Sequence, residues 1–143
     1  MRILLFAFLL IPLLGNELVA AADAATSNEQ RVRNYVEAYN RHDVDAMMTM
    51  VSDEIQWLNV AGDKLSVETR GKEQLRASLV SYFKSMPTAK SSLEWVQMTS
   101  SRVAAKEKAI WESKTGEKSQ SSLSVYEFKG GLIARVYYYS AEK

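Results

Sequence analysis

The clearest alternation of apolar and polar positions lies near the end of the chain, from Gln120 to Tyr139. Two segments with a period of two flank Gly130-Gly131, which is typical of two strands joined by a tight hairpin. Glycine readily adopts positive φ at both central positions of a primed turn, so Gly130-Gly131 predicts such a turn. Neither face of this ribbon is strictly polar, which predicts a hairpin at the centre of a sheet with protein against both faces.

The first half of the chain predicts three helices. Ser27-Asn28-Glu29-Gln30 has the form of a capping box, and apolar residues at helical spacing follow, which predicts a helix from about Asn28 to Asn40. Asp43 can cap a second, short helix. Its predicted apolar face is Val44, Met47, Met48 and Val51. A third helix begins at Gly71 and ends just beyond Met86 because Pro87 follows. Its predicted apolar face is Leu75, Leu79, Val80 and Phe83.

A small hairpin is predicted between the second and third helices. Ile55 to Val60 alternates as a strand, Ala61 to Lys64 forms a turn, and Leu65 to Thr69 returns as a more polar strand. We expect this hairpin to be marginal and peripheral. Two long strands, Leu93 to Ser101 and Val103 to Lys114, then lead into the final hairpin. Three helices followed by four consecutive antiparallel strands predict an α+β domain with its helices on one face of a curved, mainly antiparallel sheet.

The start of the chain predicts a secretory signal peptide over residues 1–24. Arg2 is followed by an almost unbroken apolar run from Ile3 to Leu14, and small residues follow that run. The run is about a dozen residues long, whereas a bilayer span needs about twenty. Cleavage is expected before Ala25, with Ala20 as a rival site and an uncleaved membrane anchor as the alternative. The expected location is periplasmic or secreted.

Removal of this leader leaves 119 residues, 25–143, which is enough for a single domain with one core. No cysteine is present, so packing and not disulfide bonds must stabilise a domain in an oxidising compartment. Without Arg2, Glu17 and Asp23, the 18 basic and 17 acidic residues become 17 and 15. This near-neutral balance predicts no nucleic-acid partner, and no membrane-binding segment is expected after leader cleavage.

Three short motifs carry a resemblance to a known family. They are Tyr35-Val36-Glu37-Ala38-Tyr39-Asn40-Arg41-His42-Asp43, Arg70-Gly71-Lys72-Glu73-Gln74-Leu75 and Phe128-Lys129-Gly130-Gly131-Leu132-Ile133. With the order of elements, they resemble the SnoaL-like branch of the nuclear-transport-factor-2-like superfamily, over essentially all of residues 25–143. The resemblance implies a cystatin-like, cone-shaped half-barrel with a pocket at its open end. A homodimer through the outer face of the sheet is expected because both faces of the central hairpin are rich in apolar or aromatic residues and the helices can cover only one of them. The resemblance implies that Arg135 and Tyr137 lie at this interface.

Members of this superfamily include isomerases, dehydratases, cyclases, epoxide hydrolases and binding proteins, so the fold does not select a function. Ketosteroid isomerase uses an aspartate base opposite a tyrosine and a protonated aspartate. Carried onto this chain, that pattern places the tyrosine at Tyr35, the base at Asn59 and the second acid at Ser124. An amide cannot abstract a proton, so isomerisation by that mechanism is not expected.

The limonene-epoxide-hydrolase branch offers a second comparison. Trp57-Leu58-Asn59 resembles its water-holding aromatic-x-Asn pair, with tryptophan in place of tyrosine. Its closing acid falls near Tyr138 and its arginine near Ile110, which leaves Glu112 as the remaining carboxylate. Only half of that site is present.

These comparisons and strand parity define the predicted ligand-binding residues, without a catalytic assignment. They are Tyr35, Trp57, Asn59, Glu112, Ser124, Tyr126 and Tyr138. Each has a structural alternative: Tyr35 can be a core residue, Asn59 can organise a turn, and Glu112 can face solvent beside Lys106 or Lys108. His42 is expected on the surface, and neither a metal nor a cofactor is expected.

Three functions remain open at this point. The first is a pocket that binds a small, largely apolar molecule without assigned catalysis. The second is a general acid-base enzyme that isomerises, dehydrates or hydrolyses such a molecule. The third is a protein-interaction module. An open cavity is expected for the first two functions, and a filled cone for the third.

Overall fold

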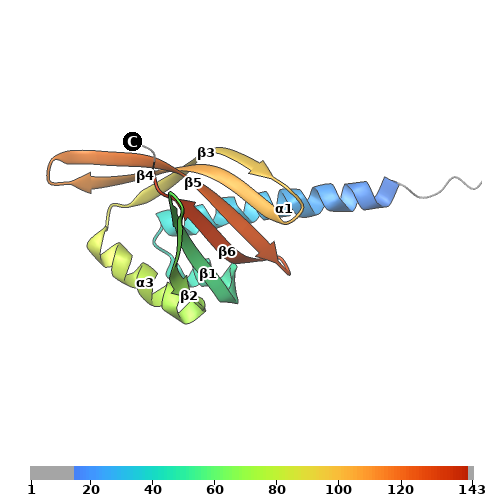
Figure 1. Cartoon of the computed structure of the whole chain (residues 1–143), viewed down its shortest axis with the longest axis horizontal. Coiled ribbons are helices and arrows are strands. Elements are labelled where there is room, and N and C mark those ends of the chain that lie inside the picture. The colour runs from blue at the N-terminus through green and yellow to red at the C-terminus, as the bar shows by residue number, and fades with distance from the viewer. Residues whose placement is uncertain (1–14, 142–143) are drawn as a thin grey trace, which may run out of the picture.

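The computed structural model describes residues 15–141, and describes side chains from Asn28 onward. Three helices pack against a six-stranded sheet (Figure 1), in which the strand order is β2-β1-β6-β5-β4-β3. The helices are α1 (Gly15–Asn40), α2 (Val44–Thr49) and α3 (Lys72–Ser85). The strands are β1 (Val51–Ala61), β2 (Lys64–Arg70), β3 (Lys90–Met98), β4 (Arg102–Ser113), β5 (Gly116–Lys129) and β6 (Leu132–Tyr139). This architecture confirms the predicted α+β fold.

The predicted central hairpin is formed by β5 and β6, which lie in the middle of the sheet. Its turn has φ of 58° at Gly130 and 77° at Gly131, so both glycines adopt the positive values of a primed turn. The inner face of β5 is buried, whereas Leu123 on its outer face is 38% exposed. In this single chain, protein therefore covers only one of the two faces.

The prediction that the β1–β2 hairpin is peripheral was wrong for β1. Of the two strands of this hairpin, β2 lies at an edge of the sheet, whereas β1 lies inside it. Strand β1 also pairs in parallel with β6, with Trp57 opposite Val136 and Asn59 opposite Tyr138. This pairing joins the first strand of the sheet to the last one. Local alternation of residues cannot reveal such a distant partner.

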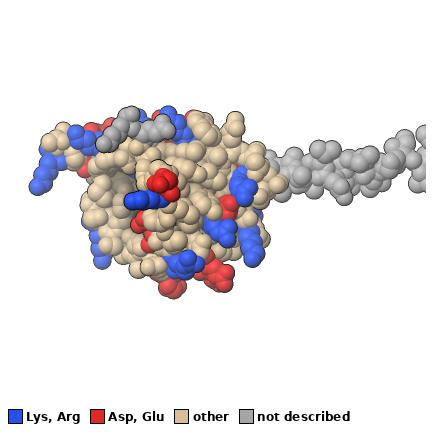
Figure 2. Space-filling view, viewed as in Figure 1, with Lys and Arg blue, Asp and Glu red and all other residues tan. Residues whose placement is uncertain are grey.

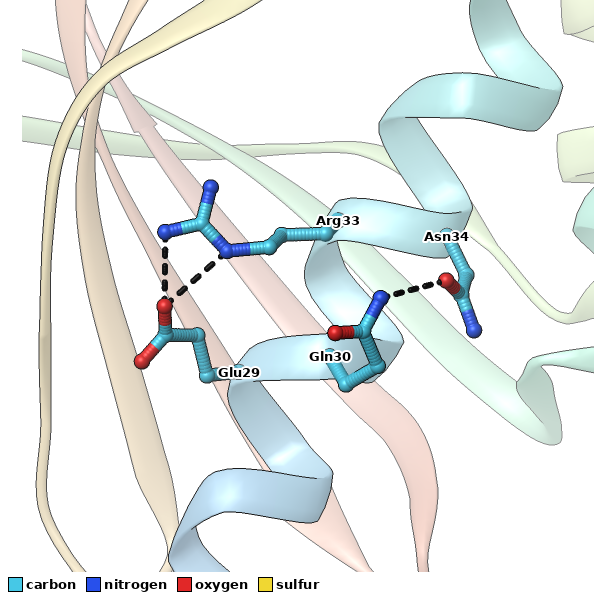
Figure 3. Close-up of polar contacts among 4 residues, drawn as sticks. All are labelled: Glu29, Gln30, Arg33 and Asn34. Carbon is cyan, nitrogen blue, oxygen red and sulfur yellow. Dashed lines mark hydrogen bonds and ion pairs between the residues drawn. The ribbon is translucent and has the colours of Figure 1, made fainter.

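Helix α1 begins at Gly15, well before the predicted start at Asn28. The alanine-rich segment between these positions favours helix, so the backbone continues through the predicted capping box. Figure 3 shows the polar side of this helix. There Arg33 Nη2 donates to Glu29 Oε1 at 2.6 Å, and Gln30 Nε2 donates to Asn34 Oδ1 at 2.9 Å. Gln30 thus stabilises the next turn of the helix through an i,i+4 pair.

The corner between α1 and α2 depends on two polar residues. Asp43 caps α2 as predicted, because its Oδ1 accepts a hydrogen bond of 2.9 Å from the Ala46 amide. His42 adopts a φ of 55°, lies 3.0 Å from the Ala89 carbonyl through Nε2, and stacks on Phe83 with ring centroids 4.1 Å apart. His42 is therefore a half-buried packing residue and not the surface residue that we expected.

Two residues of the predicted helix faces lie elsewhere. Val51, predicted on α2, is the first residue of β1. Val80, predicted on the apolar face of α3, is 40% exposed. Leu75 and Phe83 are buried on α3 as predicted. The helix follows Gly71, whose φ of 90° favours glycine, and it ends two residues before Pro87.

The core lies between the helices and the inner face of the sheet. It consists of Val32, Tyr35, Ala38, Met47, Met48, Val51, Ile55, Leu75, Phe83, Val103, Tyr126, Ile133 and Val136. In the view of Figure 2, neutral side chains cover most of the surface, and basic and acidic groups are interspersed. No helix in the described part of the chain is long and apolar enough to cross a membrane. The predicted signal peptide lies largely outside the described residues, and its cleavage stays a prediction.

Candidate functional site

A cavity of about 440 Å³ opens between α1, α3 and the inner face of the sheet. All six strands and all three helices contribute to its wall, so its shape depends on the whole fold. Its lining is mainly aromatic and aliphatic, with a few polar groups. The lining residues are Tyr35, Val36, Tyr39, Met47, Trp57, Glu68, Thr69, Leu75, Ser78, Leu79, Tyr82, Ser91, Glu107, Ala109, Gln120, Tyr126 and Tyr138.

Aromatic rings form a large part of this wall. Trp57 on β1 stacks against Tyr138 on β6, with centroids 6.3 Å apart and planes 27° apart. Across the cavity, the Tyr39 hydroxyl of α1 donates to the Tyr82 hydroxyl of α3 at 3.1 Å. Such rings offer broad apolar contact area with a polar group at one end. The wall therefore suits a ligand that is largely apolar.

The carboxylate of Glu107 on β4 lies in this aromatic wall, and Glu107 is only 6% exposed. Its Oε1 accepts hydrogen bonds of 2.5 Å from the hydroxyls of Ser124 and Tyr126, both on the neighbouring strand β5. Its Oε2 accepts a longer bond of 3.3 Å from the Ser91 hydroxyl on β3. Because a buried charge is costly without hydrogen bonds, these three hydroxyls make the position of the carboxylate possible.

The tyrosines around Glu107 have raised pKa values. Burial raises the pKa of Tyr126 and of Tyr35 well above the ordinary value, and the negative charge of Glu107 adds to both shifts. Burial also raises the pKa of Tyr138 to about 12, with the charge of Glu107 adding and the Ser122 hydroxyl opposing. At neutral pH these phenols are protonated, so they can donate hydrogen bonds but cannot serve as bases.

Two hydroxyls in the wall have no hydrogen-bond partner among the described residues. They belong to Tyr35 on α1 and Thr69 on β2, and both side chains are almost fully buried. Buried polar groups in folded proteins nearly always have a partner, which can be water or a ligand. The Tyr35 and Thr69 hydroxyls are therefore the polar groups most readily available to a bound molecule.

The structure brings together four of the predicted ligand-binding residues. Tyr35, Trp57, Tyr126 and Tyr138 all line the cavity. Ser124 is fully buried behind the wall, where its hydroxyl contacts Glu107 instead of the open space. These positions follow from the alternation of strand residues between the two faces of a sheet.

The other two predicted residues do not line the cavity. Asn59 is half-buried and lies beside Tyr138 in the β1–β6 register, but it does not form part of the wall. Glu112 is exposed, and its backbone amide donates to Thr88 Oγ1 at 2.9 Å. Glu112 therefore has the solvent-facing position that was the structural alternative for it.

The carboxylate in the wall is Glu107, which was not among the predicted site residues. Strand alternation contains the signal for it, because Val103, Ala105, Glu107 and Ala109 share one face of β4. Val103 and Ala105 are fully buried, so parity alone directs Glu107 inward and Glu112 outward. The comparison with epoxide hydrolases drew attention to Glu112 instead. Within residues 28–141, no cluster of three or more potential metal ligands is found.

A family model described as a SnoaL-like domain matches residues 32–136. This chain belongs to the SnoaL-like domain family. The match spans most of the sheet and the helices that cover it, and it confirms the predicted SnoaL-like family. A search among curated protein sequences found no significant match to this SnoaL-like domain.

Solved structures that resemble this SnoaL-like domain differ in their named activities. An uncharacterized cystatin-fold protein from Novosphingobium aromaticivorans has a TM-score of 0.68 at 23% identity and covers 78% of this chain and 96% of its own. A putative polyketide cyclase from Xanthomonas campestris has a TM-score of 0.60 at 18% identity, covering 82% and 92%. An epoxide hydrolase from M. tuberculosis, described as LEH-like, has a TM-score of 0.66 at 15% identity, covering 82% and 84%. Identities this low establish the shared fold alone.

Proposed function

We propose that this SnoaL-like domain binds a small, largely apolar molecule in the cavity between α1, α3 and the sheet. The supporting observation is a cavity of about 440 Å³ whose wall is mainly aromatic. Pockets for small molecules are usually of this size and carry only a few well-placed polar groups. Here the free hydroxyls of Tyr35 and Thr69 are those groups, and they orient the ligand.

Native mass spectrometry of the protein purified from its own host tests this proposal. We expect a retained small molecule that is released on denaturation. Tyr35→Phe and Thr69→Val each remove one hydroxyl from the wall and should weaken retention by about tenfold for each lost hydrogen bond. Tyr137→Phe removes a hydroxyl from the opposite face of the sheet and serves as the control. Equal retention by all of these variants would contradict a binding role for this cavity.

A second function, general acid-base catalysis, is favoured by one observation. Glu107 is a buried carboxylate in the wall of a cavity that also holds the unpartnered Tyr35 hydroxyl. A carboxylate can accept a proton from a bound molecule, while a phenol donates a hydrogen bond to the oxygen on which charge develops. Incubation of the retained molecule with protein in deuterated water should then introduce deuterium, and Glu107→Gln should abolish the exchange. Exchange at the same rate in both proteins would contradict catalysis by Glu107.

The open cavity gives less support to a protein-interaction module, for which a filled cone was expected. We also propose a cellular location and an oligomeric state for this protein. The first is export to the periplasm or beyond the cell, supported by the signal-peptide pattern of residues 1–24. The second is a homodimer through the outer face of the sheet, supported by large apolar side chains exposed there.

A further inference from the structure

The charged groups that line the cavity are all acidic. Glu107 lies in the wall, and Glu68 on the edge strand β2 joins it. None of the lining residues within the described part of the chain is Lys, Arg or His. The cavity therefore has one buried carboxylate, Glu107, and one exposed carboxylate, Glu68, and no lining side chain in the described part of the chain is a base that can neutralise them.

Among residues 28–141, Glu107 forms no ion pair with a cationic side chain. Its three partners are the hydroxyls of Ser91, Ser124 and Tyr126, which are neutral donors. The nearest lysines along β4 alternate to the opposite face of the sheet, where Lys106 forms an ion pair with Glu94 at 2.8 Å. A positive charge inside the cavity would meet an unpaired carboxylate in a low-dielectric environment, where attraction is strong.

The aromatic wall favours the same sign of charge. The faces of aromatic rings carry partial negative charge, so they attract cations that lose their water. Five tyrosines and one tryptophan line the cavity. A cage of such rings is the usual way in which proteins recognise an ammonium group that carries apolar substituents. A ligand of this kind would satisfy the apolar wall and the carboxylate together.

We infer that the cavity selects small organic cations, such as a protonated amine or a quaternary ammonium with apolar substituents, over neutral and anionic molecules of equal shape. This inference rests on the proposed binding function and names the class of ligand. Glu107 supplies the opposite charge at the wall, and the rings of Trp57 and Tyr138 contact the substituents. The Tyr35 hydroxyl remains free to bond an oxygen elsewhere on the ligand.

Three probes of nearly equal shape test the inference: phenyltrimethylammonium, tert-butylbenzene and benzenesulfonate. Binding to the unmodified protein can be followed by tryptophan fluorescence or by chemical shifts. We expect the cation to bind about tenfold or more tightly than the neutral probe, and the anion to bind most weakly. Tighter or equal binding of tert-butylbenzene or benzenesulfonate would overturn the inference and leave the binding function standing. Failure of all three probes, together with no retained molecule in native mass spectrometry, would overturn both.

Two variants test whether Glu107 in the cavity wall causes the preference for the cationic probe. Glu107→Gln retains the shape of the side chain and removes its charge, so the ratio of the affinity for the cation to the affinity for the neutral probe should fall to about one. Glu112→Gln changes an exposed carboxylate on the same strand and is the matched control. Equal preference in these two variants would overturn the role of Glu107. The comparison of probes on the unmodified protein needs no variant, so it decides the question even if Glu107→Gln does not fold.

Discussion

Tyr126 donates a hydrogen bond of 2.5 Å to Oε1 of Glu107, from one strand to its neighbour across the inner face of the sheet. Both residues are buried, and both take part in the wall of the cavity. The bond therefore belongs to the folded core and to the candidate binding site at once. Changes to either residue should affect both stability and binding.

Tyr126→Phe removes this donor and leaves the carboxylate with one fewer partner. Hydrogen bonds to charged groups contribute about 1.5–3 kcal/mol, so we expect the free energy of unfolding to fall by that amount. Urea denaturation measures the change. Tyr137→Phe is the control, because Tyr137 alternates to the outer face of β6. A loss of the same size in both variants would show that the bond to Glu107 contributes nothing specific.

Alkaline pH should destabilise the fold through its buried tyrosines. The pKa of Tyr138 is raised to about 12 in the folded chain, from an ordinary value of 10.0. Folding therefore favours the protonated phenol, so its contribution to stability is complete below about pH 10 and is lost as the pH rises toward about 12. The raised pKa values of Tyr35 and Tyr126 act in the same direction.

Tyr138→Phe provides the test of this pH dependence. The variant lacks the titrating group, so its free energy of unfolding should fall less steeply above about pH 10 than that of the unmodified protein. Denaturant unfolding at a series of pH values from about 8 to about 11.5 gives the two curves. Parallel curves over this window would argue against a contribution from Tyr138.

Substitutions of the two glycines in the central turn should differ in their cost to stability. A side chain at Gly131 would meet the Arg31 guanidinium, with the added Cβ 3.1 Å from Nη2, whereas Gly130 has open space around it. Both positions have positive φ. Gly130→Ala should cost about 1–2 kcal/mol of unfolding free energy because of its positive φ, and Gly131→Ala should cost more because its Cβ also meets Arg31. Thermal or urea unfolding compares them, and an equal cost would contradict the role of Arg31.

The outer face of the sheet should form a homodimer interface. Leu65 is 59% exposed, Trp95 is 44% exposed and Leu123 is 38% exposed, although all three are large and apolar. Leu123→Glu introduces a charge on the central strand β5 and should convert a dimer to a monomer in light scattering coupled to gel filtration. Val80→Glu places the same charge on an exposed position of α3 and should leave the dimer intact. A monomeric unmodified protein at micromolar concentration would contradict the proposal.

Processing of the leader gives the last prediction. Export with cleavage should produce a mature N-terminus between Ala21 and Ala25, because this alanine-rich segment follows the apolar run and offers cleavage sites after small residues. N-terminal sequencing of the exported protein measures it directly. Intact Met1 on exported protein would instead support the alternative of an uncleaved membrane anchor.

Sequence patterns predicted those features that depend on neighbouring residues. The Gly130-Gly131 turn, the Asp43 cap and the end of α3 near Pro87 each depend on local backbone preferences, and the structure confirms all three. The start of α1 was missed because a favourable capping box does not end a helix when alanine-rich sequence precedes it. The exposed position of Val80 depends on how α3 sits on the sheet, which its own periodicity does not determine.

The candidate site was predicted in part, for a related reason. Trp57, Tyr126 and Tyr138 line the cavity because strand parity fixes which face each side chain occupies. The same parity pointed to Glu107, but the comparison with a distant family favoured Glu112, five residues further along β4. A site residue of a related family can be assigned to a residue of this chain only when the register of the strand that carries it is known. That register follows here from the pairing of Glu107 with Ser122 on β5.

The parallel pairing of β1 with β6 also constrains when the protein can fold. Residues of β1 leave the ribosome well before their partner strand, which begins only at Leu132. Contacts between such distant segments form slowly, because a long loop must close before they stabilise the chain. Until β6 is complete, the cavity lacks Tyr138 and one side of the β1 strand has no neighbour. The binding cavity can therefore be completed only after β6 has been synthesised, whatever the helices and the other strands have already formed.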